Sequence, residues 1–379
     1  GLPFVMSFGG RQERILVGGK RRTIGRFGWG LSATIACLAK ERGTAVVWTR
    51  QESDEAWRSC KFQYNQIISD DCRLPSEEVG PPPPFLDIDT IGTVVMIDTY
   101  ERERVRIKPI KNMLSRHAGR TYRHRMKDGN LRFRITAREE GGPGNASGTE
   151  VLIRDPLCLI PDSEETKLFG EAKQYLPPPE LQTIQFDGDE DGPAADFPRI
   201  LREDDSIPAG IKILASRSDP VAVDHALFGN SVPSTLDRNR ELSRWGFGRN
   251  GQGISLVREG REITSSVTLG LYNKRFALNY MHAEIHFDRE LDHYFGIQTN
   301  KSRFGLDHRM KELLQPIFED MLDRIVNDHH EETDQRSQIR NKSGHSEAVD
   351  LIRNTSDRLE MPVLSGEESE QADQLREQG

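Results

Sequence analysis

Three glycines stand directly before a helical pattern near the start of the chain. Gly25, Gly28 and Gly30 occupy three of the six positions in "GRFGWG", and from Leu31 apolar and small residues recur at helical intervals until Gly43. The first turn of a helix attracts anions, and glycines let the backbone approach a phosphate closely. The pattern therefore predicts phosphate binding. The alternative is a tight loop that lets a helix of small residues pack on a sheet.

The spacing of these glycines fits neither of the two commonest phosphate loops. A P-loop requires a lysine directly after its last glycine, and Leu31 holds that position here. A dinucleotide fingerprint has the order G-x-G-x-x-G, whereas this segment reads G-x-x-G-x-G. Phosphate binding by either of those two folds is therefore not indicated.

A second group of chemically competent side chains lies in "HAEIH" at 282–286. His282, Glu284 and His286 alternate along the chain, so they share one face of a strand. Metalloproteases instead carry H-E-x-x-H on a helix, where the two histidines are one turn apart. We therefore interpret the segment as a solvent-facing strand and assign no metal ligand to the chain.

Basic residues are concentrated between 102 and 134. No aromatic stacking platform accompanies them, so the pattern favours a solvated face over nucleic-acid binding, and we assign structural roles to Tyr122 and Arg123. If DNA does bind here, its affinity should fall steeply with salt. The block consists of Arg102, Arg104, Arg106, Lys108, Lys111, Arg116, Arg120, Arg123, Arg125, Lys127, Arg132 and Arg134.

Short segments rich in β-branched and aromatic residues predict the strands that position these side chains. The glycines between 246 and 253 are expected to form a flexible entry to a strand, and 177–198 a loop. Helices are expected at 31–42, 110–117 and 306–326. Strands are expected at 44–50, near 62–68, and at 91–98, 131–136, 149–157, 211–216, 253–263 (with a turn at Glu259-Gly260) and 281–288. The order of these elements indicates a mixed α/β chain.

The composition limits the class of protein further. With 379 residues the chain is long enough for two domains, and its net charge of −8 by itself predicts neither nucleic-acid nor membrane binding. No apolar run approaches the ~20 residues of a membrane span. The four cysteines lack metal-binding spacing, which favours a reducing compartment, and we expect a cytoplasmic protein. They are Cys37, Cys60, Cys72 and Cys158.

Four motif segments follow one another in an order known from one superfamily. "FGG" (8–10) with "IGRFGWGL" (24–31) is the first, and Gly92-Thr93 at the start of a strand is the second. The third pairs "GRTYRHRM" (119–126) with "DPL" (155–157), and the fourth is "FGIQTNKSRF" (295–304). Together they resemble the GHKL ATPases, which include gyrase, a heat-shock chaperone, histidine kinases and MutL. The closest resemblance is to the bacterial chaperone-like and Microrchidia-like branch.

This resemblance implies ATP binding, with ATP hydrolysis driving lid closure and domain rearrangement. Thr93 would help to hold the adenine. Lys301, in the loop of the second domain, would reach the γ-phosphate as a catalytic cation. The implied cofactors are ATP and Mg²⁺. Backbone N–H groups of the glycine loop would bind the triphosphate, at Gly25, Arg26, Phe27, Gly28, Trp29, Gly30 and Leu31.

The resemblance also implies the domain organisation. Residues 1–108 would be the carboxy-terminal part of a Bergerat-type α/β sandwich that binds ATP. Residues 109–328 would form a transducer domain of the ribosomal S5-like fold, with a βαβ crossover, and 329–379 a disordered polar tail. The catalytic glutamate, the magnesium-binding asparagine and the adenine motif D-x-G-x-G of the superfamily precede the lid, and nothing before Gly10 resembles them. We therefore expect an amino-terminally truncated fragment, with the metal ligand upstream.

A second function class remains open on these residues. It is a non-enzymatic interaction or DNA-binding protein that kept a degenerate ATPase fold and lost the active site. The resemblance is compatible with a homodimer and with a DNA or protein client. We expect no membrane partner. Nucleotide hydrolysis would favour the first class, and tight, salt-sensitive DNA binding without nucleotide would favour the second.

Overall fold

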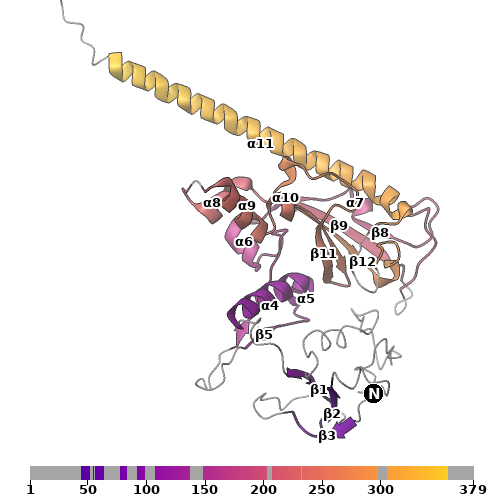
Figure 1. The fold of residues 1–379 in the computed structure, drawn as a ribbon. Helices are drawn as coiled ribbons and strands as arrows, with labels where there is room; N and C mark the ends of the chain where they lie inside the picture. The colour runs from indigo at the N-terminus through magenta and orange to yellow at the C-terminus, as the bar shows by residue number, and fades with distance from the viewer. Residues whose placement is uncertain are drawn as a thin grey trace, which may run out of the picture. The chain divides into compact units, whose positions relative to one another are not determined.

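A computed structural model describes residues 44–51, 54, 56–63, 77–82, 92–98, 107–136, 148–202, 207–231, 233–297 and 305–356. Within this part the chain is a mixed α/β protein, as expected (Figure 1). Residues 1–43 and 298–304 lie outside the described part, and with them the glycine loop, its helix and Lys301. The structure divides into two units at Leu322.

The first sheet is small and antiparallel, with the strand order β3-β2-β1-β4. Trp48, Trp57 and Val94 form its buried cluster, against which Val46 and Met96 pack. The expectations for 44–50 and 91–98 are confirmed, because both segments carry the β-branched residues that a pleated surface favours. Strand β2 includes the first two residues of the strand expected near 62–68, and residues 64–68 lie outside the described part. The strands are β1 (Thr44–Arg50), β2 (Arg58–Gln63), β3 (Glu77–Val79) and β4 (Gly92–Asp98).

Two helices and a short hairpin follow. Helix α4 (Ile107–Thr121) leads at once into α5 (Arg123–Lys127), and β5 (Arg134–Ile135) pairs with β6 (Thr149–Glu150). The strand expected over 149–157 is therefore wrong beyond residue 150. Backbone N–H groups of residues 157, 159 and 160 bond to the Asp155 carboxylate, so the chain turns instead of extending.

The segment 177–198 is not only a loop. Helix α7 (Pro179–Gln182) begins at a proline, which suits the first turn of a helix, and β8 (Thr183–Gln185) follows it directly. Strand β8 pairs with β9 and buries Ile184 completely. Before these elements stand α6 (Glu164–Phe169) and β7 (Lys173–Tyr175).

The second sheet has the path β11-β10-β12-β9-β7, with β8 paired to β9. Strands β10 and β12 are parallel, and β9 and β11 run antiparallel to their neighbours. The parallel pair is connected through the antiparallel β11 and no α-helix, so the expected βαβ crossover does not form between these strands. The longer strands are β9 (Gly210–Arg217), β10 (Gly253–Arg258), β11 (Arg261–Val267) and β12 (Met281–Phe287).

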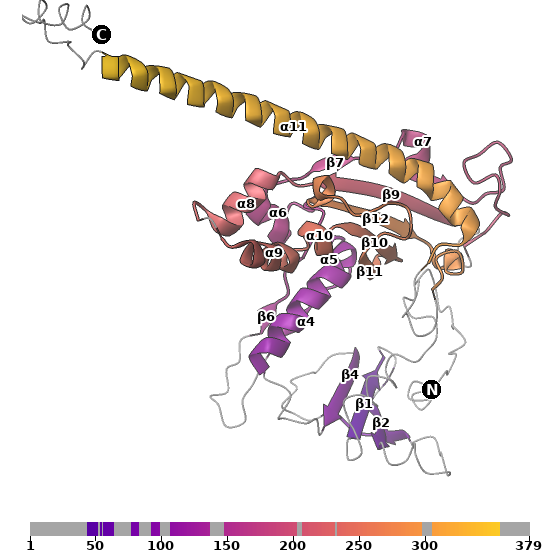
Figure 2. The same cartoon turned by 45° about the horizontal axis from the view of Figure 1, so that its top comes forward.

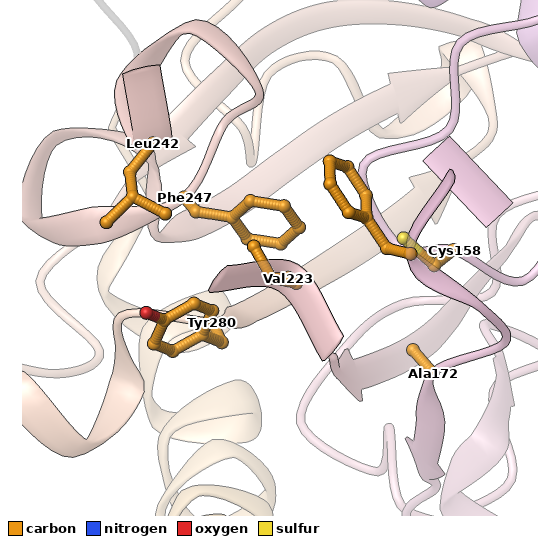
Figure 3. Packing of buried hydrophobic residues seen from close by; sticks show 7 residues of the cluster. Cys158, Ala172, Val223, Leu242, Phe247 and Tyr280 are labelled. Carbon is orange, nitrogen blue, oxygen red and sulfur yellow. The ribbon is translucent and has the colours of Figure 1, made fainter. Parts of the chain in front are cut away.

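A helical layer beside the sheet encloses the core shown in Figure 3. Cys158, Val223 and Phe247 are completely buried there, and the rings of Phe169 and Phe247 meet edge to face with centroids 5.3 Å apart. Trp245 packs against this cluster, and its ring meets that of Phe169 edge to face. The helices are α8 (Pro220–Phe228), α9 (Thr235–Arg244) and α10 (Gly248–Gly251).

The glycines before β10 do not form the flexible entry that we expected. They form the short helix α10 and a close backbone crossing, where a Cβ on Gly251 would lie 1.9 Å from the carbonyl oxygen of Gly246. A side chain at Gly251 would collide with the backbone of Gly246, so only glycine fits at that position.

The two faces of the second sheet differ in chemistry. On one face of β12 lie Ala283, Ile285 and Phe287, and the β9 residues paired with them are also apolar. The other face carries His282, Glu284 and His286. Figure 1 and Figure 2 show the α4–α5 pair and the first turns of α11 on opposite sides of this sheet. The polar face is therefore the one next to α5.

Helix α11 (His308–Ser356) closes the described chain. In the first unit it buries Met310, Leu314 and Phe318, which are spaced at helical intervals as expected. The helix continues to Ser356, within the polar segment whose composition predicts disorder. Residues 329–356 contain no proline, so nothing in the backbone chemistry forces an earlier end.

Candidate functional site

Of the residues that the resemblance assigns to the nucleotide, only Thr93 lies in the described part of the chain. It is exposed on β4, and its hydroxyl oxygen lies 3.2 Å from that of Thr49, its partner in the strand register. Gly25–Leu31 and Lys301 lie outside the described residues. Their roles stay predictions.

The described residues converge instead on a buried cluster of charges around Arg123. This arginine is the first residue of α5 and is fully inaccessible to solvent. Its Nε donates to Glu284 Oε1 at 3.0 Å, and Nη2 donates to the same oxygen. Its Nη1 donates to Glu262 Oε2 and to the carbonyl oxygen of Arg120, each at 2.7 Å. Arg123 thus connects α5 to two strands of the sheet.

Two histidines approach the other oxygen of the same glutamate. His286 Nε2 lies 2.6 Å from Glu284 Oε2, and His124 Nε2 lies 3.1 Å from it. The two imidazole centroids are 4.6 Å apart at an interplanar angle of 71°. The three side chains offer ligand atoms that all lie within 4.8 Å of one another.

Burial and charge together set the protonation of this cluster. Burial alone would raise the pKa of Glu284, but Arg123 and the histidine contacts outweigh it and hold that pKa well below its ordinary value. Burial lowers the pKa of His286, although Glu284 opposes the shift. Burial also lowers the pKa of His282 to about 3, with Arg120 and Arg123 adding to the effect. At neutral pH the glutamate is therefore a carboxylate, and His282 and His286 are neutral imidazoles.

A close backbone contact positions α4 against the segment that precedes α6. A Cβ on Gly119 would lie 2.2 Å from the carbonyl oxygen of Leu152, and Arg154 N donates to the carbonyl oxygen of Gly119 at 3.2 Å. The approach brings Asp155 Oδ1 within 3.8 Å of Arg123 Nε. The two halves of the third motif, 119–126 and 155–157, therefore meet in space.

The solvent-facing interpretation of "HAEIH" is wrong. Strand β12 lies between β10 and β9, and His282 and Glu284 are 3% and 0% exposed. The expectation of a solvated basic face is wrong at Arg123, which is buried against Glu284 and Glu262. Arg132 and Arg134 are exposed as expected. Alternation along a strand indicates two faces but not which of them is covered.

His124 is the member of the cluster that sequence reasoning missed. It is far from β12 along the chain, so no local spacing links it to Glu284 or His286. Its only signal is its position directly after Arg123, inside a segment that we interpreted as structural.

Comparison with known proteins adds no family to this geometry. The sequence matches no protein-family model, and no curated protein matches it significantly. Among the described residues, the helices are too short or too polar to cross a bilayer.

Proposed function

We propose that this chain is part of a GHKL-type ATPase, in which ATP binding and hydrolysis drive lid closure and a movement of the second domain. Residues Gly25–Leu31 would donate backbone N–H groups to the triphosphate. Thr93 would contact the adenine, and its exposed side chain on β4 suits that contact. When bound, ATP with Mg²⁺ would supply a transferable phosphoryl group.

The observation that carries the proposal is the base of the loop that contains Lys301. Residues 298–304, which include Lys301, lie outside the described part, but the backbone on both sides of them is described. Ile297 N donates to the carbonyl oxygen of Asp292 at 3.0 Å, and Asp307 N donates to that of Tyr294 at 2.8 Å. Asp292 is in turn held by Arg258 of β10 through two hydrogen bonds of 2.6 and 2.9 Å.

This anchoring suits a transducer loop. A lysine that docks on a phosphate can move a domain only if its loop is fixed to a rigid element, and here both ends of the loop are bonded to residues that follow β12. Lys301 would then stabilise the negative charge on the oxygens of the transferring phosphoryl group. Its contact with that group would pull on the anchored loop and so on the sheet. The GHKL domains named above, Bergerat-type and S5-like, remain part of this proposal.

Lys301→Ala in the protein made from the complete reading frame tests the proposal. We expect turnover to fall by about tenfold or more with nucleotide affinity nearly unchanged, because the contact is made mainly in the transition state. Lys167→Ala is the matched control, since Lys167 is an exposed lysine on α6 whose partner Asp162 is also exposed. Steady-state hydrolysis and nucleotide titration are the two measurements.

Two results would contradict the proposal. One is equal turnover in Lys301→Ala and the parent protein, which would remove the lysine from the reaction. The other is an absence of nucleotide binding combined with tight DNA binding that weakens steeply with salt, which would support the non-enzymatic alternative.

A further inference from the structure

We propose that His124, Glu284 and His286 bind one divalent transition-metal ion, for which Zn²⁺ is the best-suited candidate, at a site with an open coordination position. The site lies between α5 and β12. It is independent of the ATPase proposal and uses none of its residues.

The ligand atoms are of the right kind, and all three lie within 4.8 Å of one another. Two imidazole nitrogens and one carboxylate oxygen are a common ligand set for Zn²⁺, which they bind at about 2.0–2.2 Å, so that tetrahedral ligand atoms lie about 3.3 Å apart. His124 Nε2 and Glu284 Oε2 are already 3.1 Å apart. The 2.6 Å contact of His286 Nε2 must open by about 0.7 Å to reach that spacing, which a small side-chain rotation allows.

His124 Nε2 lies close to Glu284 without the geometry of a hydrogen bond. Its Nε2 is buried and makes no hydrogen bond, although Glu284 Oε2 lies only 3.1 Å away, because the direction of approach is wrong for one. An imidazole nitrogen that faces a carboxylate oxygen without bonding to it is placed as a second ligand of a shared ion would be. Two imidazole nitrogens thus meet one carboxylate oxygen, one of them without hydrogen-bond geometry, and this convergence is the observation that favours a metal over a simple hydrogen-bond cluster.

Hydrogen bonds from Arg123 to Oε1 fix the orientation of the Glu284 carboxylate. Arg123 occupies Glu284 Oε1, so Oε2 is left facing the histidines. Outer partners of this kind fix the direction of a ligand and are typical of metal sites. Arg123 also donates a hydrogen bond to Glu262. The negative charge of Glu262 partly neutralises the guanidinium and so limits its repulsion of a bound cation.

The glutamate of the site is covered, whereas the rings of the two histidines reach solvent in part, although His124 Nε2 itself is buried. The Glu284 side chain is 1% exposed, whereas those of His124 and His286 are 23% and 24% exposed. A three-ligand site that reaches solvent keeps a fourth position for water or a small anion, which distinguishes it from a closed structural zinc site.

Titration of the untagged 379-residue chain with Zn²⁺, after treatment with a chelator and dialysis, tests the proposal. We expect one equivalent to bind, the midpoint of thermal unfolding to rise, and Co²⁺ to give the intense visible absorption of a low-coordinate site. His124→Ala and His286→Ala should each weaken binding by about a hundredfold or more, since loss of an outer partner alone costs about 10–100-fold. Both variants leave the Arg123–Glu284 pair intact, so their apo forms should keep the parent's circular dichroism spectrum.

Two control variants identify the site. His293→Ala removes an exposed histidine of the same domain, and the double variant His329→Ala/His330→Ala removes the neighbouring pair on α11. Both should bind Zn²⁺ as the parent does. The proposal is overturned if the parent binds no stoichiometric metal, or if His124→Ala and His286→Ala bind Zn²⁺ as tightly as the parent does.

Discussion

Arg123 and Glu284 form an ion pair between α5 and the central strand β12, with Arg123 Nε 3.0 Å from Glu284 Oε1. The two side chains are 0% and 1% exposed, so solvent stabilises neither charge. Glu262 and Asp155 also approach the guanidinium, which leaves more acidic than basic charge close to it. The pair holds α5 against the sheet, and the guanidinium of Arg123 keeps the buried Glu284 carboxylate ionised.

Arg123→Met should therefore destabilise the fold strongly. Methionine fills a similar volume but leaves buried carboxylates without a counter-charge, which costs about 3–5 kcal/mol. The measurement is the free energy of unfolding in urea. Arg244→Met is the control: Arg244 pairs with Glu241 at 3.3 Å on the surface, where such a pair contributes about 0–1 kcal/mol. Similar losses in both variants would contradict a special role for the buried pair.

Gly119→Ala should destabilise the protein even though alanine is the better helix former. The gain in helix propensity is about 1 kcal/mol, but the added methyl group would lie 2.2 Å from the carbonyl oxygen of Leu152 and would force α4 away. We expect a net loss of stability of about 1–2 kcal/mol in the same urea experiment. Gly305→Ala, where a Cβ meets nothing within 4 Å, should be nearly neutral. A stabilised Gly119→Ala variant would show that the contact is not made.

His282 should make the protein less stable as the pH falls. Burial, with help from Arg120 and Arg123 and against the opposing Glu284, lowers its pKa from 6.5 to about 3. Between these two values the unfolded chain binds a proton that the folded chain does not, so the stability present above pH 6.5 is lost as pH decreases. The expected loss from this residue between about pH 7 and about pH 5 is about 2 kcal/mol.

Unfolding free energies of His282→Gln and the parent at those two pH values measure this loss. The variant should be less sensitive to pH by the stated amount, because glutamine does not titrate. His293→Gln, at an exposed position, should keep the full dependence of the parent. An equal dependence in His282→Gln and the parent would mean that the pKa of His282 does not change on folding.

Cys158 should be unreactive in the folded protein. Its thiol is completely buried, and burial together with Asp155 and Glu165 raises its pKa to about 12, although a hydrogen bond from Ser218 opposes the shift. The thiolate is the reactive form, so alkylation should be slower than that of a free cysteine by about a thousandfold. Mass spectrometry of the peptide after timed iodoacetamide treatment measures the rate. Rapid labelling without denaturant would contradict the burial.

The sequence alone predicted those elements whose pattern of residues lies within a short segment. The hairpin of β10 and β11 was expected at the correct turn, since Glu259 and Gly260 form a two-residue loop, and both adopt the positive φ angles that such a turn requires. The sequence also predicted strands β1, β4, β9 and β12 and the start of α11. Alternation and helical spacing depend only on residues that are close together in the sequence.

The tertiary structure decided which of these surfaces are covered. The pattern of β12 is the same whether its polar face meets water or protein. In the fold, Arg123 of α5 covers Glu284, and the Phe247 ring packs on His282. The meeting of His124 with Glu284 joins residues that are 160 positions apart (284 − 124), and that of Arg123 with Glu284 joins residues that are 161 positions apart (284 − 123). Short-range patterns follow from backbone geometry, whereas a site built across such separations depends on which elements pack together, and no local rule encodes that choice.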